Sequence, residues 1–322
     1  MGLLTCEVLH LTGLFLSYLC PPMDLSSYTG ELAALLTAVF WAFTAMAFEV
    51  ASKHIGSLAV NMIRLVLAFI FLSVFNLVVR GYILPVDAGV HEWVWLSVSG
   101  LVGFVFGDYF LFRSYAMISA RIAMLIMTLV PPITAVIGWM ILGETMSGQE
   151  ITGMVLTVSG IAMAIFSRGG ENGRKIKLSY APMGLLMALL GTIGQAVGLV
   201  LSKYGMGSYH AFAATQIRII AAMLGFAVII IFLRKGGLIR KAFKSKKGLI
   251  GTGIGSVFGP FLGVSFSLVA VKYASTGVAS TLMAIVPILL IPPALLFFKQ
   301  KVTSLEILGA FISVGGVTLF FV

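Results

Sequence analysis

Several ionisable side chains stand within or at the ends of long apolar runs, where charge is costly and usually functional. Glu49, Arg64 and Asp108 are expected near the same face of a membrane, with Arg113 close by. Such a cluster could be a gate that breaks when two halves of the protein move, or a static link between helices. Asp108 is the candidate for proton coupling, because burial favours the neutral form of a carboxyl group. A neighbouring Arg64 or Arg113 favours the charged form, so the sequence leaves the balance open.

Two further cations, Arg218 and Lys203, are expected near the opposite face. Arg218 is another candidate for gating or coupling. Lys203 stands near the end of an apolar run, so we expect its ammonium group to extend to the lipid head groups.

The composition explains why these charges stand out. The chain has 322 residues, of which 60% are hydrophobic and 10% are charged, and its mean hydropathy is +1.09. Soluble domains carry about 25% charged residues, so a soluble globule is excluded, as is a disordered chain. The two cysteines, Cys6 and Cys20, support neither a disulfide framework nor a zinc site.

Ten apolar runs are long enough to cross a bilayer, which takes about 20 residues each. Lipid offers the backbone no hydrogen-bond partner, so each crossing must be helical. We therefore expect an all-α integral membrane protein. The predicted spans are 30–51, 58–79, 93–112, 122–142, 150–167, 181–202, 211–233, 248–271, 276–298 and 304–322.

The first 22 residues stand apart from these spans. They are mostly apolar and contain no Lys or Arg, which a signal peptide carries in its first region. A polar stretch after Met23 leads into the first strong span. We expect Met23 to be the true start and residues 1–22 to be an N-terminal extension; a real eleventh hydrophobic segment is the alternative.

The second half of the chain, 181–322, repeats the first, 30–167. The matched positions include Arg, Pro, Gly and Glu. They are Ile63-Arg64 with Ile217-Arg218 (offset 154), Phe106-Gly107 with Phe258-Gly259 (152), and, at 156, Val130-Pro131 with Val286-Pro287, Glu150 with Glu306, Gly153 with Gly309 and Gly160 with Gly316. Each copy holds five spans, and an odd number places the second copy upside down relative to the first. Two inverted five-helix repeats are an architecture of alternating-access carriers.

The basic residues predict an orientation. With ten crossings, 16 of the 21 Lys and Arg fall on one face, and Arg80, Lys203 and Lys272 fall on the other. The richer face is expected to be cytoplasmic. The basic loop 234–247 then lies at an anionic lipid surface, and we expect no nucleic-acid partner.

Several motifs resemble the drug/metabolite transporter superfamily, in particular its EamA-type members. The resemblance covers about 30–322. It is carried by Trp41, Ile63-Arg64-Leu65, Phe106-Gly107-Asp108-Tyr109, Val130-Pro131-Pro132, Leu142-Gly143-Glu144, and Gly153 with Gly160. The resemblance implies a secondary transporter that moves small organic metabolites, amino-acid-like or related solutes, outward across a bacterial inner membrane. The pattern is specific for the fold and weak for the solute.

The family arrangement implies a pocket near the midplane, lined by six of the ten helices. Its side chains suit a partly apolar solute held by a few hydrogen bonds, although each Met or Phe could equally be packing. The pocket candidates are Trp41, Thr44, Phe104, Met127, Thr128, Thr192, Gln195, Phe258, Ser265 and Thr281. Gln195 is the most specific candidate among them, because an amide group in hydrocarbon needs a hydrogen-bond partner. Pro131 and Pro287 free carbonyl groups within helices and are hinge candidates.

Two other functional classes are weighed against a carrier. An intramembrane enzyme is one: Ser265 resembles a serine nucleophile, but no His follows His210, and no paired-His motif is present. A channel-like facilitator is the other, and it would more often be built from symmetric subunits around a pore. We expect no enzymatic activity, no metal and no cofactor. The expected partners are the solute and the lipid bilayer, with a monomer possible.

Overall fold

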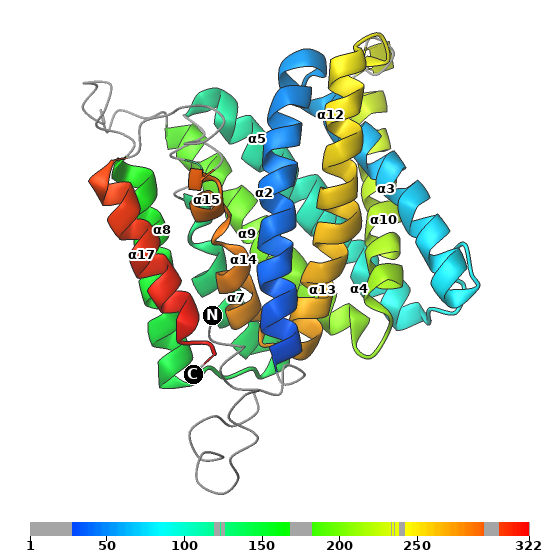
Figure 1. Ribbon diagram of the computed structural model, residues 1–322. Helices are drawn as coiled ribbons and strands as arrows, with labels where there is room; N and C mark the ends of the chain where they lie inside the picture. Colours follow the sequence, from blue (N-terminus) through cyan, green and yellow to red (C-terminus); the bar gives the residue numbers. More distant parts are fainter. Residues whose placement is uncertain are drawn as a thin grey trace, which may run out of the picture.

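In the computed structural model, the described residues are 28–118, 123, 126–167, 182–232, 234, 236–237, 242–292 and 303–321. Their regular structure is helical throughout (Figure 1). Residues 1–22, the expected N-terminal extension, lie outside the described part. The helices are α2 (Thr29–Ile55), α3 (Ser57–Arg80), α4 (Val90–Gly100), η2 (Leu101–Gly107), α5 (Asp108–Met117), α7 (Val130–Leu142), α8 (Gly148–Ser167), α9 (Pro182–Met206), α10 (Ala211–Phe232), α12 (Lys246–Ser256), η3 (Val257–Gly263), α13 (Val264–Tyr273), α14 (Thr276–Met283), α15 (Val286–Leu289) and α17 (Ser304–Thr318).

The helices run up and down in one bundle, so the loops lie at the two ends of the bundle. The lower end in Figure 1 holds the start of α2 and the end of α9. The upper end holds the start of α9 and the end of α10. Within the described ranges, six helical segments are long and apolar enough to cross a membrane: Thr29–Phe48, Leu58–Arg80, Val90–Leu111, Pro182–Met206, Ala211–Phe232 and Lys246–Tyr273. The shorter apolar helices are Val130–Leu142, Thr276–Leu289 and Ser304–Thr318.

Two of the predicted spans contain a wider helical segment at their centre. η2 and η3 are π-helical turns, which place one extra residue per turn in a helix. They begin 156 residues apart, at Leu101 and Val257. The sequence match of Phe106-Gly107 with Phe258-Gly259 at 152 is therefore out of register, since the π turns match at 156. At the offset of 156 the counterpart of Asp108 is Val264, which is apolar.

The prolines expected to kink helices from within stand instead at helix starts. Pro131 is the second residue of α7, and Pro287 is the second residue of α15. A proline in the first helical turn leaves no hydrogen bond unmade, because that turn has no intrahelical acceptor for its N–H. Between α14 and α15 the chain turns at Ala284 and Ile285. The helix is thus interrupted before each proline rather than bent at it.

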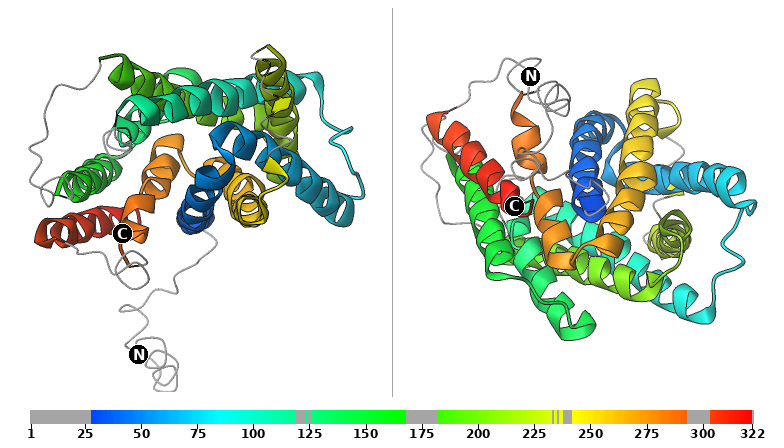
Figure 2. Two further views of the ribbon diagram at one scale, coloured as in Figure 1. Left: turned by 90° about the horizontal axis from the view of Figure 1, so that it is seen from above. Right: turned by 60° about the horizontal axis from the view of Figure 1, so that its bottom comes forward.

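Helices α8 and α17 lie side by side at one edge of the bundle in both views of Figure 2. Glycines make the close approach possible. A Cβ on Gly160 would lie 2.5 Å from the carbonyl oxygen of Gly309, and a Cβ on Gly309 would lie 2.6 Å from that of Gly160. Gly153 and Gly316 face each other in the same reciprocal way, at 2.9 and 2.8 Å. Small residues drive helix association in lipid, because they let backbones pack.

Candidate functional site

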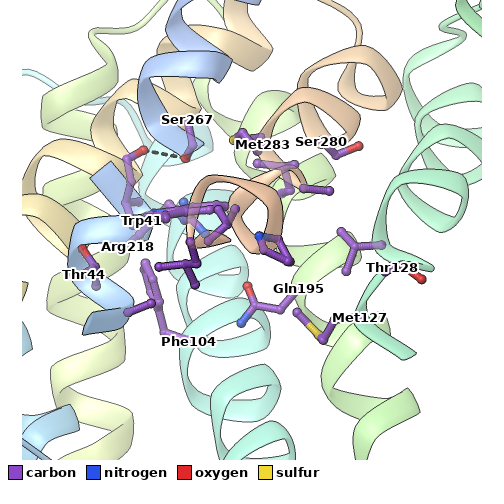
Figure 3. A pocket seen from close by; sticks show the side chains of 18 residues that line it. Trp41, Thr44, Phe104, Met127, Thr128, Gln195, Arg218, Ser267, Ser280 and Met283 are labelled. Atoms are coloured by element: carbon purple, nitrogen blue, oxygen red, sulfur yellow. Dashed lines mark hydrogen bonds between the residues drawn. The ribbon is translucent and has the colours of Figure 1, made fainter. Parts of the chain in front are cut away.

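A cavity of about 520 Å³ opens in the middle of the bundle, and both halves of the chain line it (Figure 3). It lies against the interrupted helices, since Thr128, Val130, Ala284 and Pro287 are on its wall. Most of the wall is apolar. The polar or aromatic side chains on it are Trp41 and Thr44 of α2, Phe104 of η2, Thr128, Gln195 of α9, Arg218 of α10, Ser267 of α13 and Ser280 of α14.

Arg218 brings a positive charge to this wall while only 5% of its surface is exposed. Its guanidinium carbon lies 4.8 Å from the centre of the Phe104 ring, a cation–π contact. Its Nε has no hydrogen-bond partner. Gly103 lies next to the group, since a Cβ there would be in van der Waals contact with an Arg218 terminal nitrogen, at 3.4 Å.

Asp108 lies beside the cavity and binds both halves of the chain. Its Oδ2 accepts a hydrogen bond from Arg64 Nη2 of α3, and the two side chains form an ion pair about a tenth exposed. Its Oδ1 accepts a hydrogen bond of 2.9 Å from Gln195 Nε2 of α9. Gln195 also donates to the Gly103 carbonyl at 3.2 Å. The amide thus has the polar partners that burial in an apolar bundle demands.

Packing of small residues holds these groups in place. Helix α9 crosses η2 so closely that a Cβ on Gly198 would lie 2.7 Å from the Cα of Gly103. One turn away, a Cβ on Gly194 would lie 2.8 Å from the Cα of Gly107. The crossing places Gln195 within reach of Asp108, which follows Gly107 directly.

Six of the ten pocket candidates lie together on the cavity wall. They are Trp41, Thr44, Phe104, Met127, Thr128 and Gln195. The hinge candidate Pro287 and the coupling candidate Arg218 lie on the same wall. Pro131 is buried in the first turn of α7, next to Val130 on the wall.

The other four pocket candidates do not face the cavity. Thr192 and Thr281 donate to carbonyls of their own helices, those of Ala188 and Gly277, at 2.9 and 2.7 Å. Phe258 packs its ring 5.4 Å from that of Phe43. Ser265 is buried away from the cavity.

Ser267 and Ser280 take the places that sequence reasoning gave to Ser265 and Thr281. One residue along an α-helix rotates a side chain by about 100°, so a small error in phase selects the wrong face. The π-helical turn η3 precedes Ser265 and shifts the phase further. Met283 and Leu199 also line the cavity and were missed, because their types do not differ from those of packing residues.

The remaining charged candidates are dispersed. Arg113 is not part of the Asp108 cluster: it is exposed and donates to the Tyr109 hydroxyl at 2.8 Å. The side chain of Glu49 lies outside the described part of the structure. Arg64 joins Asp108 as expected, with its guanidinium carbon 5.5 Å from the centre of the Phe48 ring.

Lys203 does not extend toward lipid, contrary to the sequence expectation. Its Nζ lies 2.5 Å from Glu144 Oε1 and donates to the Ala274 carbonyl at 2.6 Å. The other oxygen of Glu144 accepts from the backbone N–H and hydroxyl of Thr276, at 2.8 and 2.6 Å. An acid within reach binds the ammonium better than distant head groups do. This cluster joins the two halves of the chain at the lower end.

A second polar cluster at the lower end was not foreseen. Asp87 pairs with Arg80 and accepts from the Tyr209 hydroxyl at 3.0 Å. Burial raises the pKa of Tyr209. Burial also lowers the pKa of the neighbouring His210, and the charges of Arg80 and Lys272 lower it further. These residues stand in loops or at the ends of spans, where a sequence carries little periodic signal.

Across the described residues, no group of three or more His, Cys, Asp or Glu side chains is placed to hold a metal ion. The geometry instead provides a cavity between helices, a buried cation on its wall, and a buried acid linked to both halves of the chain.

The model of the EamA-like transporter family matches residues 28–166 and 182–322, which together form most of the chain. The chain belongs to the EamA-like transporter family. Each match covers one of the two repeats. The EamA family is part of the drug/metabolite transporter superfamily, and its members are transporters. Together with the apolar helices, this makes the chain an integral membrane protein.

The EamA match is accompanied by similarity to two curated proteins. The chain is 28% identical over 148 residues to YoaV, an uncharacterized transporter of Bacillus subtilis, covering 45% of this chain and 49% of YoaV. It is 24% identical over 187 residues to YMR253C, an uncharacterized membrane protein of Saccharomyces cerevisiae, covering 54% and 45%. The chain thus spans about half the length of the curated relatives it matches.

A solved crystal structure, described only as that of a protein, has the same fold. It superposes with a TM-score of 0.73 at 15% identity, over 90% of this chain and 95% of that one. At this identity the likeness concerns the EamA fold alone.

Proposed function

We propose that the protein is a secondary transporter that exports small organic metabolites by alternating access. The single observation that carries the proposal is the central cavity, lined by both repeats and set against interrupted helices. Transporters bind solute near the midplane at the interface of their repeats, where helices are discontinuous. The volume of about 520 Å³ suits a small organic solute.

The proposal includes ten crossings in two inverted five-helix repeats, 30–167 and 181–322. The reciprocal glycine contacts support inversion. Gly153 is matched in sequence by Gly309, and Gly160 by Gly316, yet Gly153 faces Gly316 and Gly160 faces Gly309. Such crossed contacts arise when a two-fold axis in the membrane plane relates two antiparallel helices.

The proposed coupling site is Asp108 with Arg64. The pair links α3 to α5 inside the first repeat, whereas the bond from Gln195 crosses to the second. Movement of one repeat against the other would break the Gln195 bond and leave the ion pair intact. We assign Asp108 the role of coupling that movement to a change in its own hydrogen bonding. We assign Pro131 and Pro287 the role of hinges.

Counterflow in proteoliposomes tests the transport function. Vesicles holding the purified protein are loaded with one unlabelled solute and exposed to the labelled solute, over a panel of amino acids, carboxylates, nucleosides and sugars. A carrier accumulates label transiently against its gradient, and at least one solute is expected to do so. A channel would only equilibrate the label, and absence of counterflow for the whole panel would contradict the proposal.

Ser265→Ala addresses the alternative of an intramembrane enzyme. Because Ser265 lies outside the cavity, counterflow is expected to stay at the wild-type rate. Hydrolysis of a panel of ester and peptide substrates that disappears in this variant would favour the enzyme instead.

A further inference from the structure

We infer that the cavity binds a hydrophobic monocarboxylate, with Arg218 as the residue that holds the carboxylate group. The inference rests on the proposed function, in that the cavity is taken as the solute site. It adds the chemical class of the solute, which neither the fold nor the family supplies.

The first step concerns the burial, hydrogen bonding and charge of Arg218. Arg218 lines the cavity and is only 5% exposed. Its Nε has no hydrogen-bond partner. No acid lies within ion-pair distance of it in the described ranges. Its contact with Phe104 is a cation–π contact, which does not supply a hydrogen-bond acceptor for the Nε–H. A buried charge without a partner is strongly unfavourable, so a group outside the protein is expected to complete the site.

The second step is the charge balance around the cavity. Asp108 is the acid that acts electrostatically on Arg218, but its oxygens are bound by Arg64 and Gln195. Arg64 and Asp108 cancel each other, and Arg218 remains as one positive charge. A solute with a single negative charge neutralises it. A doubly charged phosphate would leave an excess negative charge in an apolar bundle.

The third step is the shape of the donor. A guanidinium presents N–H groups in a planar fork that matches the two oxygens of a carboxylate. Arg218 approaches the cavity from α10, and Trp41 and Met283 are among the side chains on the rest of the wall (Figure 3). The apolar wall suits a hydrocarbon or aromatic body attached to the carboxylate.

The cavity is poorly suited to the ammonium group of a zwitterionic amino acid. Arg218 is the charged residue on the described wall, and the wall's remaining polar side-chain groups are hydroxyls, one amide and the indole N–H of Trp41, which can only donate. A buried ammonium group without a carboxylate partner is costly. The geometry therefore favours a carboxylate without an adjacent amine.

Binding to the wild-type protein gives the first test, and it needs no variant. The purified protein in nanodiscs is titrated with 4-methylpentanoate, with its neutral amide 4-methylpentanamide, and with leucine, which adds the amine. Tryptophan fluorescence is the readout, because Trp41 lines the cavity. We expect the carboxylate to bind at least ~10-fold more tightly than the amide and than leucine, as for a charge-assisted bond that replaces a neutral one. Equal affinities, or no binding of the carboxylate, would overturn the inference.

Substitution of Arg218 gives the second test. Arg218→Gln is expected to remove the preference for the carboxylate over the amide, and Arg218→Lys to keep part of it. The Gln variant is expected to fold, because Arg218 has no acid that its loss would strand. Lys244→Gln removes a positive charge from an exposed position and serves as the matched control. A folded Arg218→Gln variant that still prefers the carboxylate would contradict the assignment to Arg218.

The two proposals fail in different ways. Binding with the predicted preference but without counterflow of any solute would contradict the transport function and leave the anion site standing. Counterflow of neutral or zwitterionic solutes without carboxylate binding would support a carrier and refute the anion site.

Discussion

Asp108 is held by both repeats at once, through different oxygens. Oδ2 is bound by Arg64 of the first repeat and Oδ1 by Gln195 of the second. A single carboxylate is thereby placed where relative movement of the repeats changes its hydrogen bonds. The second repeat has no equivalent acid, since its matching position is Val264.

We predict that Asp108→Asn abolishes counterflow while the protein still folds. The amide retains a carbonyl oxygen for Gln195 but cannot balance Arg64. The uncompensated cation should lower stability by about 3 kcal/mol or more. Melting temperature in nanodiscs and counterflow rate measure the two effects.

The double variant Arg64→Gln/Asp108→Asn separates charge balance from function. It is expected to recover most of the melting temperature and none of the transport. Wild-type counterflow in Asp108→Asn would remove the residue from the mechanism.

His210 provides a prediction on pH. Burial lowers its pKa below the ordinary value of 6.5, and the charges of Arg80 and Lys272 lower it further, against a smaller opposite effect of Asp87. The unfolded chain therefore takes up a proton on His210 at a higher pH than the folded chain does. The stability due to neutral His210 is present above about pH 6.5 and declines below it.

The melting temperature is thus expected to fall between about pH 7.5 and 5.5, and to fall less in His210→Gln. His54→Gln, at an exposed position of α2, is the control. The same decline in His210→Gln as in the wild type would show that other groups cause it.

At the residue level, the sequence indicates which side chains need polar partners where the residue type is unusual for its surroundings. Arg64, Asp108 and Gln195 are polar groups in apolar helices, where a buried polar group is unfavourable unless it has a hydrogen-bond partner. Thr281 shows the limit, because a hydroxyl group in an α-helix can also bond to its own backbone, as Thr281 does to the Gly277 carbonyl. Ser265 is buried outside the cavity, and a serine in an apolar helix does not by itself indicate which face it occupies.

At the scale of elements, two features were beyond the sequence. The π-helical turns η2 and η3 add a residue per turn without a change in hydrophobic pattern. The sequence therefore gives no sign that the side chains of α5 and α13, which follow these turns, are rotated about the helix axis. The interruptions before Pro131 and Pro287 could not be told from kinks in the sequence, because a proline alone is compatible with a kink or with a helix start.

The packing of α8 on α17 is a testable property of these elements. Gly160→Ala is expected to lower stability by about 1–3 kcal/mol, the usual cost of overpacking. The added methyl group would meet the backbone at Gly309 and Ser313, at 2.5 Å from each. Thermal unfolding in nanodiscs measures the change.

Gly315→Ala on the neighbouring helix α17 is the control, since no atom lies within 4 Å of its added Cβ. Its stability should stay the same or rise, because alanine favours a helix. An equal loss in both variants would indicate that the glycines contribute conformation and not close contact.

At the scale of the whole molecule, two polar clusters join the repeats at the lower end, in addition to the bond between Gln195 and Asp108. Glu144 of the first repeat binds Lys203 and Thr276 of the second, and Asp87 binds Tyr209. These contacts hold the lower ends of the two repeats together in this conformation. The general class, an all-helical membrane protein with two repeats, followed from apolar length and internal matches, which do not depend on side-chain phase. The EamA family followed from the resemblance of the motifs.

The excess of basic residues predicts that the upper end, with the basic loop 234–247, faces the cytoplasm. With Cys6 and Cys20 replaced by Ser, a cysteine introduced as Lys244→Cys should resist a membrane-impermeant thiol reagent in intact cells and react after permeabilisation. Rapid reaction in intact cells would reverse the orientation.

The central claim is that one cavity is exposed to each side of the membrane in turn. The most direct measurement uses Ser280→Cys, on the cavity wall, in the same background and in sealed proteoliposomes of one orientation. Alternating access predicts that an impermeant thiol reagent modifies this cysteine when added to either side, while the vesicles stay impermeable to the reagent. Modification from one side only, under conditions in which the protein transports solute, would contradict the account.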